Sequence, residues 1–157
     1  MESRLQQELK KKHPFASLEQ EAALNLMRTN DQMHIQFTRL FRHHGLTPSQ
    51  YNILRILRGE GQPLESMEIA NRTVTVVPGI TGLIDRLERE GYVVRQRCDR
   101  DRRVIRVAIT DKAKQVLEAL DQPVMDLHRE LMSHLTEEEL RQLIRLLEKV
   151  RMPLAEK

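Results

Sequence analysis

Residues 91–109 read GYVVRQRCDRDRRVIRVAI, and this stretch decides the fold. Its two arms alternate like β-strands and are rich in β-branched residues, first over residues 92–97 and again from Val104 to Ile109. Residues 95–106 hold six arginines and two aspartates, a local charge of +4 in a chain whose net charge is +3. The stretch therefore predicts a β-hairpin with positive charge near its tip, a surface that favours phosphate-rich partners.

Two helices are expected before this hairpin, in the first part of the chain. Residues 17–44 repeat apolar side chains at helical intervals, and Gly45 closes this helix. Pro48 begins a second helix, which Gly59 and Gly61 stop. The apolar face of the second helix is wide enough to be buried.

A helix-turn-helix is expected next. A short helix over residues 65–72 is followed by a tight connection at residues 73–75 and by another helix over residues 77–90, which Gly91 ends. Two short helices joined by a turn of three or four residues form this motif.

Two further helices follow the hairpin. Thr110 is a favourable N-cap for the first, whose apolar stripe reaches Leu131, although Pro123 is expected to kink or break it. Thr136 and Glu139 have the spacing of a capping box and begin the last helix.

This order of elements predicts a mainly α fold of the α+β class, a winged helix-turn-helix with flanking N- and C-terminal dimerisation helices. Over about residues 45–120 the chain resembles the MarR (multiple-antibiotic-resistance regulator) family of transcription factors. The matching residues are GLTPSQY at 45–51, EIA at 68–70, TGLIDRLE at 81–88 followed by Gly91, DRR at 101–103 and IT at 109–110. The resemblance implies a sequence-specific DNA-binding regulator, most simply a repressor released by a small molecule or by oxidation.

The resemblance also assigns roles in the hairpin, which would be the DNA-binding wing. Asp101 orients Arg103, whose guanidinium enters the minor groove and reads its width and potential. Arg102 contacts a phosphate, and sequence-independent affinity through counterion release comes from Arg95, Arg97 and Arg100. The alternative is a solvated hairpin whose Arg–Asp pairs each contribute only ~0–1 kcal/mol.

By the same resemblance, residues 77–90 form the recognition helix that meets base edges in the major groove. Its start is poor in hydrogen-bonding groups, because residues 76–79 read VVPG and Gly82 stands where the family commonly has arginine or asparagine. Apolar and shape-based contacts are therefore expected, with polar contacts from Arg72, Thr75, Thr81 and Arg86. Two alternatives to DNA contact stay open. Thr75 could simply cap the helix, with Pro78 starting it. Independently, Arg86 could pair with Asp85, Glu90 or the wing.

The bulk properties predict one domain over residues 1–157, with a winged lobe at 46–110 and dimerisation helices at 1–45 and 111–157. No apolar run reaches the ~20 residues of a membrane span, and the N-terminus lacks the apolar stretch of a signal peptide. The single cysteine, Cys98, excludes an intrachain disulfide and fits a reducing compartment. We therefore expect a cytoplasmic protein without membrane association.

Apolar stripes at both chain ends exceed what a small winged lobe covers. They predict a homodimer, which would present two recognition helices to a palindromic operator in double-stranded DNA. In the family, effectors bind between the dimer region and the DNA-binding lobe. Candidates for lining a pocket for an unidentified small-molecule effector are Met33, Phe37, Phe41, Tyr51 and Leu54, although the stripes favour the alternative that each is plain core.

The same residues allow three other functions. A winged helix could use the basic hairpin on an acidic protein partner. Cys98 could act as a redox sensor beside Arg97, but family sensors carry cysteines in the outer helices, which here have none, so an incidental thiol is the preferred interpretation. Residues that could form a catalytic centre, a phosphate loop or a metal site lack the required spacing, so neither an enzyme nor a cofactor is expected.

Overall fold

The computed structural model describes residues 3–98, 101 and 103–155 and shows a mainly helical fold with one two-stranded antiparallel sheet. The predicted fold class is confirmed. Along the chain the elements are α1 (Arg4–Glu8), α2 (Leu18–His43), α3 (Pro48–Glu60), α4 (Ser66–Asn71), α5 (Ile80–Arg89), β1 (Val93–Arg97), β2 (Ile105–Ile109), α6 (Asp111–Met132) and α7 (Glu137–Ala155).

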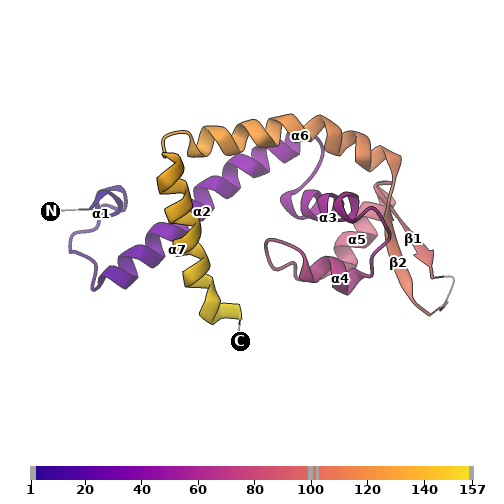
Figure 1. Cartoon of the computed structure of the whole chain (residues 1–157), viewed down its shortest axis with the longest axis horizontal. Coiled ribbons are helices and arrows are strands. Elements are labelled where there is room, and N and C mark those ends of the chain that lie inside the picture. The colour runs from indigo at the N-terminus through magenta and orange to yellow at the C-terminus, as the bar shows by residue number, and fades with distance from the viewer. Residues whose placement is uncertain (1–2, 99–100, 102, 156–157) are drawn as a thin grey trace.

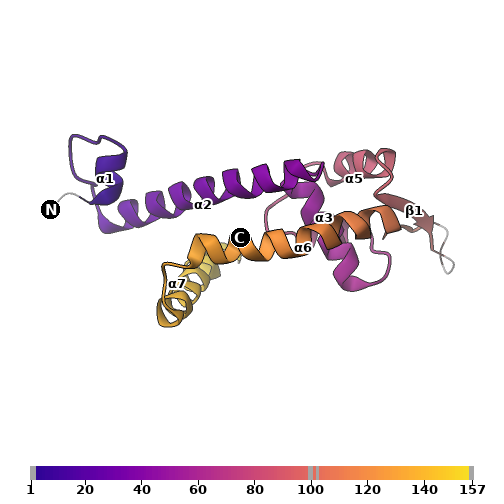
Figure 2. The same cartoon turned by 90° about the horizontal axis from the view of Figure 1, so that it is seen from above.

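The molecule is elongated, with a winged lobe at one end (Figures 1 and 2). We use this name for α3, α4, α5, the two strands and the first half of α6, and we call the two strands with the residues between them the wing. Helices α2 and α6 contact each other along the path from the lobe to the far end. There α1 folds back beside the start of α2, while α7 turns away from α6.

Nearly all of the buried core lies in the winged lobe. Helix α3 supplies the centre, and α4, α5, both strands and α6 pack around it. The largest fully buried side chains are Leu46, Ile53, Leu54, Leu57, Ile69, Ile84, Leu87, Val93, Val107, Leu117 and Leu120. In contrast, no described side chain of α7 is buried.

Side-chain caps begin the longer helices where the sequence predicts them. Ser17 caps α2, and Thr110 caps α6 by accepting a hydrogen bond from the backbone N–H of Ala113. Thr136 and Glu139 bond each other's backbone N–H groups at the start of α7, which confirms the predicted capping box.

The predicted start of the recognition helix is wrong. Helix α5 begins at Ile80 rather than at Val77, so the connection from α4 spans residues 72–79. Gly79 is the N-cap and has a φ of 70°, a left-handed conformation that separates Pro78 from the helix. Thr75 therefore neither caps this helix nor belongs to it, and Pro78 does not start it.

Two further differences concern the helices outside the lobe. Pro123 does not break α6, because the helix continues through it to Met132; Leu120 and Val124 on either side are buried, and this packing holds the segment helical. Helix α1 was not predicted because five residues are too short to show a hydrophobic period.

Two glycines test the start of α5, because replacing each by alanine should change the free energy of unfolding in opposite directions. Gly79→Ala should lower the free energy of unfolding by about 1–2 kcal/mol, because alanine is strained at a φ of 70°. Gly82→Ala should raise it by about 0.5–1 kcal/mol, because this glycine lies inside the helix. A Cβ at either position meets nothing within 4 Å, so packing does not interfere. Denaturant titration measures both; equal stabilities would contradict this helix start.

Candidate nucleic-acid interface

Helix α5 is divided between a buried and an exposed face. Ile84 and Leu87 are fully buried in the lobe. Thr81, Gly82 and Arg86 are exposed, and their spacing places them together on the opposite face. Thr81 and Arg86, the two residues of α5 that the sequence assigns to DNA contact, share this face with the exposed side chains of Asp85 and Arg89.

The wing is an antiparallel ladder that pairs Val93 with Ile109 at its base and Arg97 with Ile105 near its tip. Beyond the strands, the N–H of Cys98 donates to the carbonyl of Val104 at 3.0 Å. Val93 and Val107 are fully buried, so the base of the wing belongs to the core, whereas Arg97, Asp101 and Arg103 near its tip are exposed.

Asp101 organises the backbone of the wing tip. Its carboxylate accepts a hydrogen bond from the backbone N–H of Arg103 at 2.9 Å, and its carbonyl accepts one from Val104 at 3.0 Å. Asp101 thus bonds Arg103, as expected, but through the main chain and not through the guanidinium. Arg100 and Arg102 lie outside the described residues.

Two of the arginines predicted to meet DNA are held within the chain. Arg95 forms ion pairs of 2.5 Å with both Asp85 and Glu88 of α5. Arg72 forms one of 2.5 Å with Glu60. Neither guanidinium can contact a phosphate without breaking these ion pairs.

Other basic side chains of the lobe point into solvent. Arg86, Arg97 and Arg103 are exposed, and no ion pair to any of them occurs within the part of the chain that the structure describes. Arg106 is equally exposed and lies opposite Gln96, on the other face of the wing from Arg97. Arg106 belongs to the basic cluster of residues 95–106 but is not among the predicted DNA contacts. The alternation of the strand already places its side chain on the face opposite Ile105 and Val107.

The connection between α4 and α5 is apolar and exposed. The exposed fraction is 79% for Val74 and 94% for Val76, so neither contributes to the core. Thr75 between them is exposed as well and lines a cavity. A surface of this kind can contact thymine methyl groups but offers few hydrogen-bond donors to base edges.

That cavity has a volume of about 520 Å³ and lies between α2, α3, α6 and the α4–α5 connection. Its wall includes four of the five apolar candidates: Met33, Phe37, Phe41 and Tyr51. The rings of Phe41 and Tyr51 stack at 4.2 Å between centroids, and Phe37 lies 4.9 Å from the ring of His128. The fifth candidate, Leu54, is fully buried in the core.

Basic groups gather around the aromatic rings of this cavity. Its lining includes His34, Arg55 and His128, and no carboxylate stands among the described residues that line it. Burial raises the pKa of the Tyr51 hydroxyl above its usual range, although Arg55 and Arg58 act in the other direction. Tyr51 therefore remains a neutral hydroxyl that can donate a hydrogen bond.

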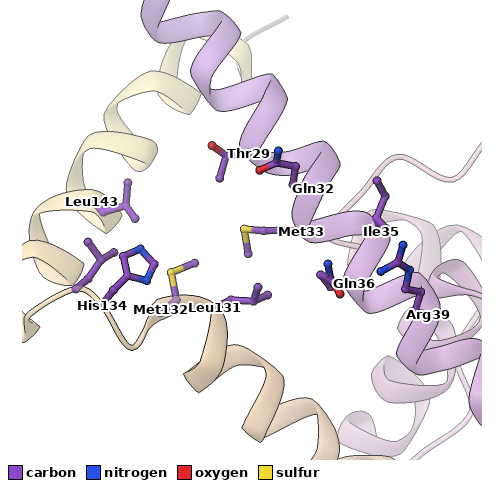
Figure 3. A pocket seen from close by; sticks show the side chains of 11 residues that line it. Thr29, Gln32, Met33, Ile35, Gln36, Arg39, Leu131, Met132, His134 and Leu143 are labelled. Carbon is purple, nitrogen blue, oxygen red and sulfur yellow. The ribbon is translucent and has the colours of Figure 1, made fainter. Parts of the chain in front are cut away.

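A second cavity, of about 560 Å³, opens between α2 and the junction of α6 with α7. Figure 3 shows Met33, Leu131, Met132 and Leu143 around this opening, with Thr29 and Gln32 above it on α2. These four apolar side chains are only partly buried within the chain.

The described residues hold no group of three or more His, Cys, Asp or Glu side chains arranged to bind a metal ion. Among them, no helix is both long enough and apolar enough to span a membrane.

Known proteins share both the sequence pattern and this architecture. A sequence model of the MarR family matches residues 44–104. The homoprotocatechuate degradative operon repressor of Escherichia coli is 27% identical over 123 residues, which cover 78% of this chain and 82% of the repressor. The crystal structure of a MarR transcription factor from Planctomyces limnophilus is 42% identical with a TM-score of 0.65, covering 86% of this chain and 98% of that one.

The fold alone extends to more distant regulators. The 2,4-dichlorophenol-bound form of the organohalide-sensing regulator RdhR-CbdbA1625 is 19% identical with a TM-score of 0.79, over 90% of this chain and 86% of that one. These relatives are regulators of transcription. The similarity therefore does not favour the two alternative functions, a protein-binding module and a cysteine-based sensor. The chain belongs to the MarR family and is a DNA-binding transcriptional regulator.

Proposed function

We propose that the chain is a repressor that binds a palindromic operator as a homodimer and leaves it when a small aromatic anion enters the cavity beside α3. The observation that carries the DNA-binding part is the juxtaposition of two features on one lobe. One is the exposed face of α5 with Thr81 and Arg86, and the other is a wing whose Arg97 and Arg103 are exposed and outside any ion pair within the described residues.

Each part of this surface suits one part of a duplex. Helix α5 presents Thr81 and Arg86 to base edges in the major groove, and the exposed valines of the α4–α5 connection reach thymine methyl groups. Arg103 at the wing tip enters the minor groove, in a turn that Asp101 fixes. Arg97, with Arg100 and Arg102 outside the described residues, contacts phosphates. Arg72 and Thr75 contribute less than the sequence suggests, since Arg72 is paired with Glu60 and Thr75 lies outside α5.

Replacing Arg103 tests the wing contact. Arg103→Ala should weaken operator binding by about 1–3 kcal/mol and leave thermal unfolding unchanged, because the side chain is exposed. Arg129→Ala is the matched control, since it removes an exposed arginine from α6 outside the lobe. Fluorescence anisotropy with an operator selected from random duplexes provides the measurement. Wild-type affinity for Arg103→Ala would remove the wing tip from the interface.

Homodimerisation is supported by the uncovered far end of the molecule. Ile144 and Val150 on α7 are 56% and 55% exposed, and the second cavity beside them is lined by Met33, Leu131 and Leu143. A second copy would bury these surfaces and place two winged lobes on one duplex. In this arrangement residues 1–45 and 111–157 form the dimerisation region and residues 46–110 the DNA-binding lobe. Such a regulator acts in the cytoplasm and without catalysis.

A charge in this apolar stripe should separate the two copies. Light scattering should give a dimer for the intact chain and a monomer for Ile144→Glu, because the interface cannot pair a buried carboxylate. Gln142→Glu adds the same charge at an exposed position two residues away and should remain dimeric. A folded monomer for the unmodified chain would defeat the two-half-site arrangement.

The aromatic cavity suits a flat, anionic effector. The rings of Phe37, Phe41 and Tyr51 can stack on an aromatic ligand, and Arg55 offers positive charge to a carboxylate or phenolate. The cavity also includes Thr75 from the α4–α5 connection, so its contents touch the segment that leads into α5. An organohalide-sensing regulator of the same fold was solved with 2,4-dichlorophenol, a flat aromatic phenol.

The effector site can be tested with a panel of benzoates, hydroxybenzoates and phenols. At least one member should raise the melting temperature and release the operator. Arg55→Gln should lower its affinity by about 1.5–3 kcal/mol through loss of a charge-assisted hydrogen bond. Arg39→Gln is the control, because Arg39 lines the other cavity. An effector whose binding is unaffected by Arg55→Gln and weakened by Arg39→Gln would place the site in that second cavity.

A further inference from the structure

Arg95 lies on the wing but is bound to the recognition helix. Its guanidinium forms ion pairs with Asp85 and Glu88, which stand one turn apart on α5. Its backbone N–H donates to the same Glu88 carboxylate at 3.0 Å. One carboxylate thus holds both the main chain and the side chain of a single wing residue.

The pattern of the β-ladder explains why this N–H is available. Arg95 is opposite Val107 in the sheet, and Val107 exchanges both of its backbone hydrogen bonds with Leu64, at 2.7 and 3.1 Å. The polar groups of Val107 therefore point away from β1, which makes Arg95–Val107 a non-hydrogen-bonded pair. As a result the Arg95 N–H faces outward from the ladder, and Glu88 of α5 satisfies it.

The wing is consequently fastened along both of its edges. On the β2 side, Leu64 bonds Val107 just before α4 begins. On the β1 side, Glu88 and Asp85 hold Arg95. Only the second attachment joins the wing directly to the helix that enters the major groove.

We propose that Asp85, Glu88 and Arg95 form a positioning clamp that sets the wing at the angle to α5 at which one lobe reaches the major and the minor groove together. This proposal rests on the DNA-binding surface described above. Arg95 is then a positioning residue and not a phosphate contact, in contrast to its predicted role in counterion release. The preorganised angle benefits operator binding, where both grooves must be matched, and does little for random DNA.

The charges of the clamp distinguish this role from a simple surface ion pair. Asp85 and Glu88 place two carboxylates on the helix that approaches a polyanion, which weakens binding to any duplex. Removing one of them should therefore strengthen DNA binding if electrostatics alone matters. The clamp instead predicts that removing one of these carboxylates weakens binding to the operator.

The test is Glu88→Gln, which keeps the size of the side chain and removes its charge. Affinity is measured for the selected operator and for a random duplex of equal length. Operator binding should weaken by about fivefold or more, whereas random-duplex binding should stay equal or become tighter. Glu118→Gln on α6 is the control for loss of one exposed negative charge and should not lower the ratio of the two affinities.

Operator binding by Glu88→Gln that equals or exceeds wild type would overturn the clamp, and so would an equal loss on both duplexes. If Glu88→Gln does not fold, Arg95→Lys provides the test. Lysine keeps the positive charge but lacks the planar guanidinium that can bond two carboxylates at once. It should lower the operator-to-random ratio at unchanged random-duplex affinity, and an unchanged ratio would overturn the clamp. Failure of the wild-type protein to prefer any duplex would instead refute the proposed function.

Discussion

The winged lobe depends on the burial of α3. Ile53 and Leu54 are fully inaccessible and Leu57 nearly so, and α2, α4, α6 and β2 each contact this helix. Truncating such a side chain typically costs 2–5 kcal/mol, a large share of the stability of a single domain. Two details fix how α3 enters the lobe: the Thr47–Gln50 capping box at its start, and a hydrogen bond of 2.8 Å from the Gln50 amide to Glu90 just after α5. The position of the recognition helix is thus tied to the best-buried helix of the chain.

The arginines of the wing divide into two groups with different tasks. Arg95 is paired with α5 and joins parts of the lobe, while Arg97 and Arg103 are exposed and form no ion pair with another described residue. Local positive charge alone would not distinguish them, because each carries the same unit charge on the same hairpin. What separates them is strand position: Arg95 lies within reach of α5, and Arg97 lies beyond it near the tip. We therefore propose that Arg95 positions the wing while Arg97, two residues further along the same strand, attracts DNA.

The sequence predicts those parts of the fold that depend on local chemistry. The caps at Thr110 and Thr136 and the alternation of the hairpin arms are properties of a few adjacent residues, and the structure confirms them. The start of α5 was misjudged because Pro78 is a common first helical residue, whereas the left-handed Gly79 after it overrides that preference.

Long-range pairing is the part that the sequence does not reveal. A count of charges shows an excess in residues 95–106, but it cannot show that Arg95 is neutralised by carboxylates seven and ten positions earlier in the chain. In the same way, an apolar stripe in the sequence does not distinguish a cavity wall from a packed core. Tyr51 lines a cavity while Leu54, on the same stripe of α3, is sealed in the core. These distinctions require the three-dimensional arrangement.

The central claim is that arginines of the wing meet DNA phosphates, and the salt dependence of binding tests it most directly. The affinity of the dimer for a random duplex should fall steeply as salt rises. The slope of log affinity against log salt should be about −5, since the three proposed phosphate contacts in each of two protomers (Arg97, Arg100 and Arg102) release counterions at about 0.9 per contact. A slope near zero, together with tight binding to an acidic peptide, would contradict the account and identify the basic hairpin as a protein-binding surface.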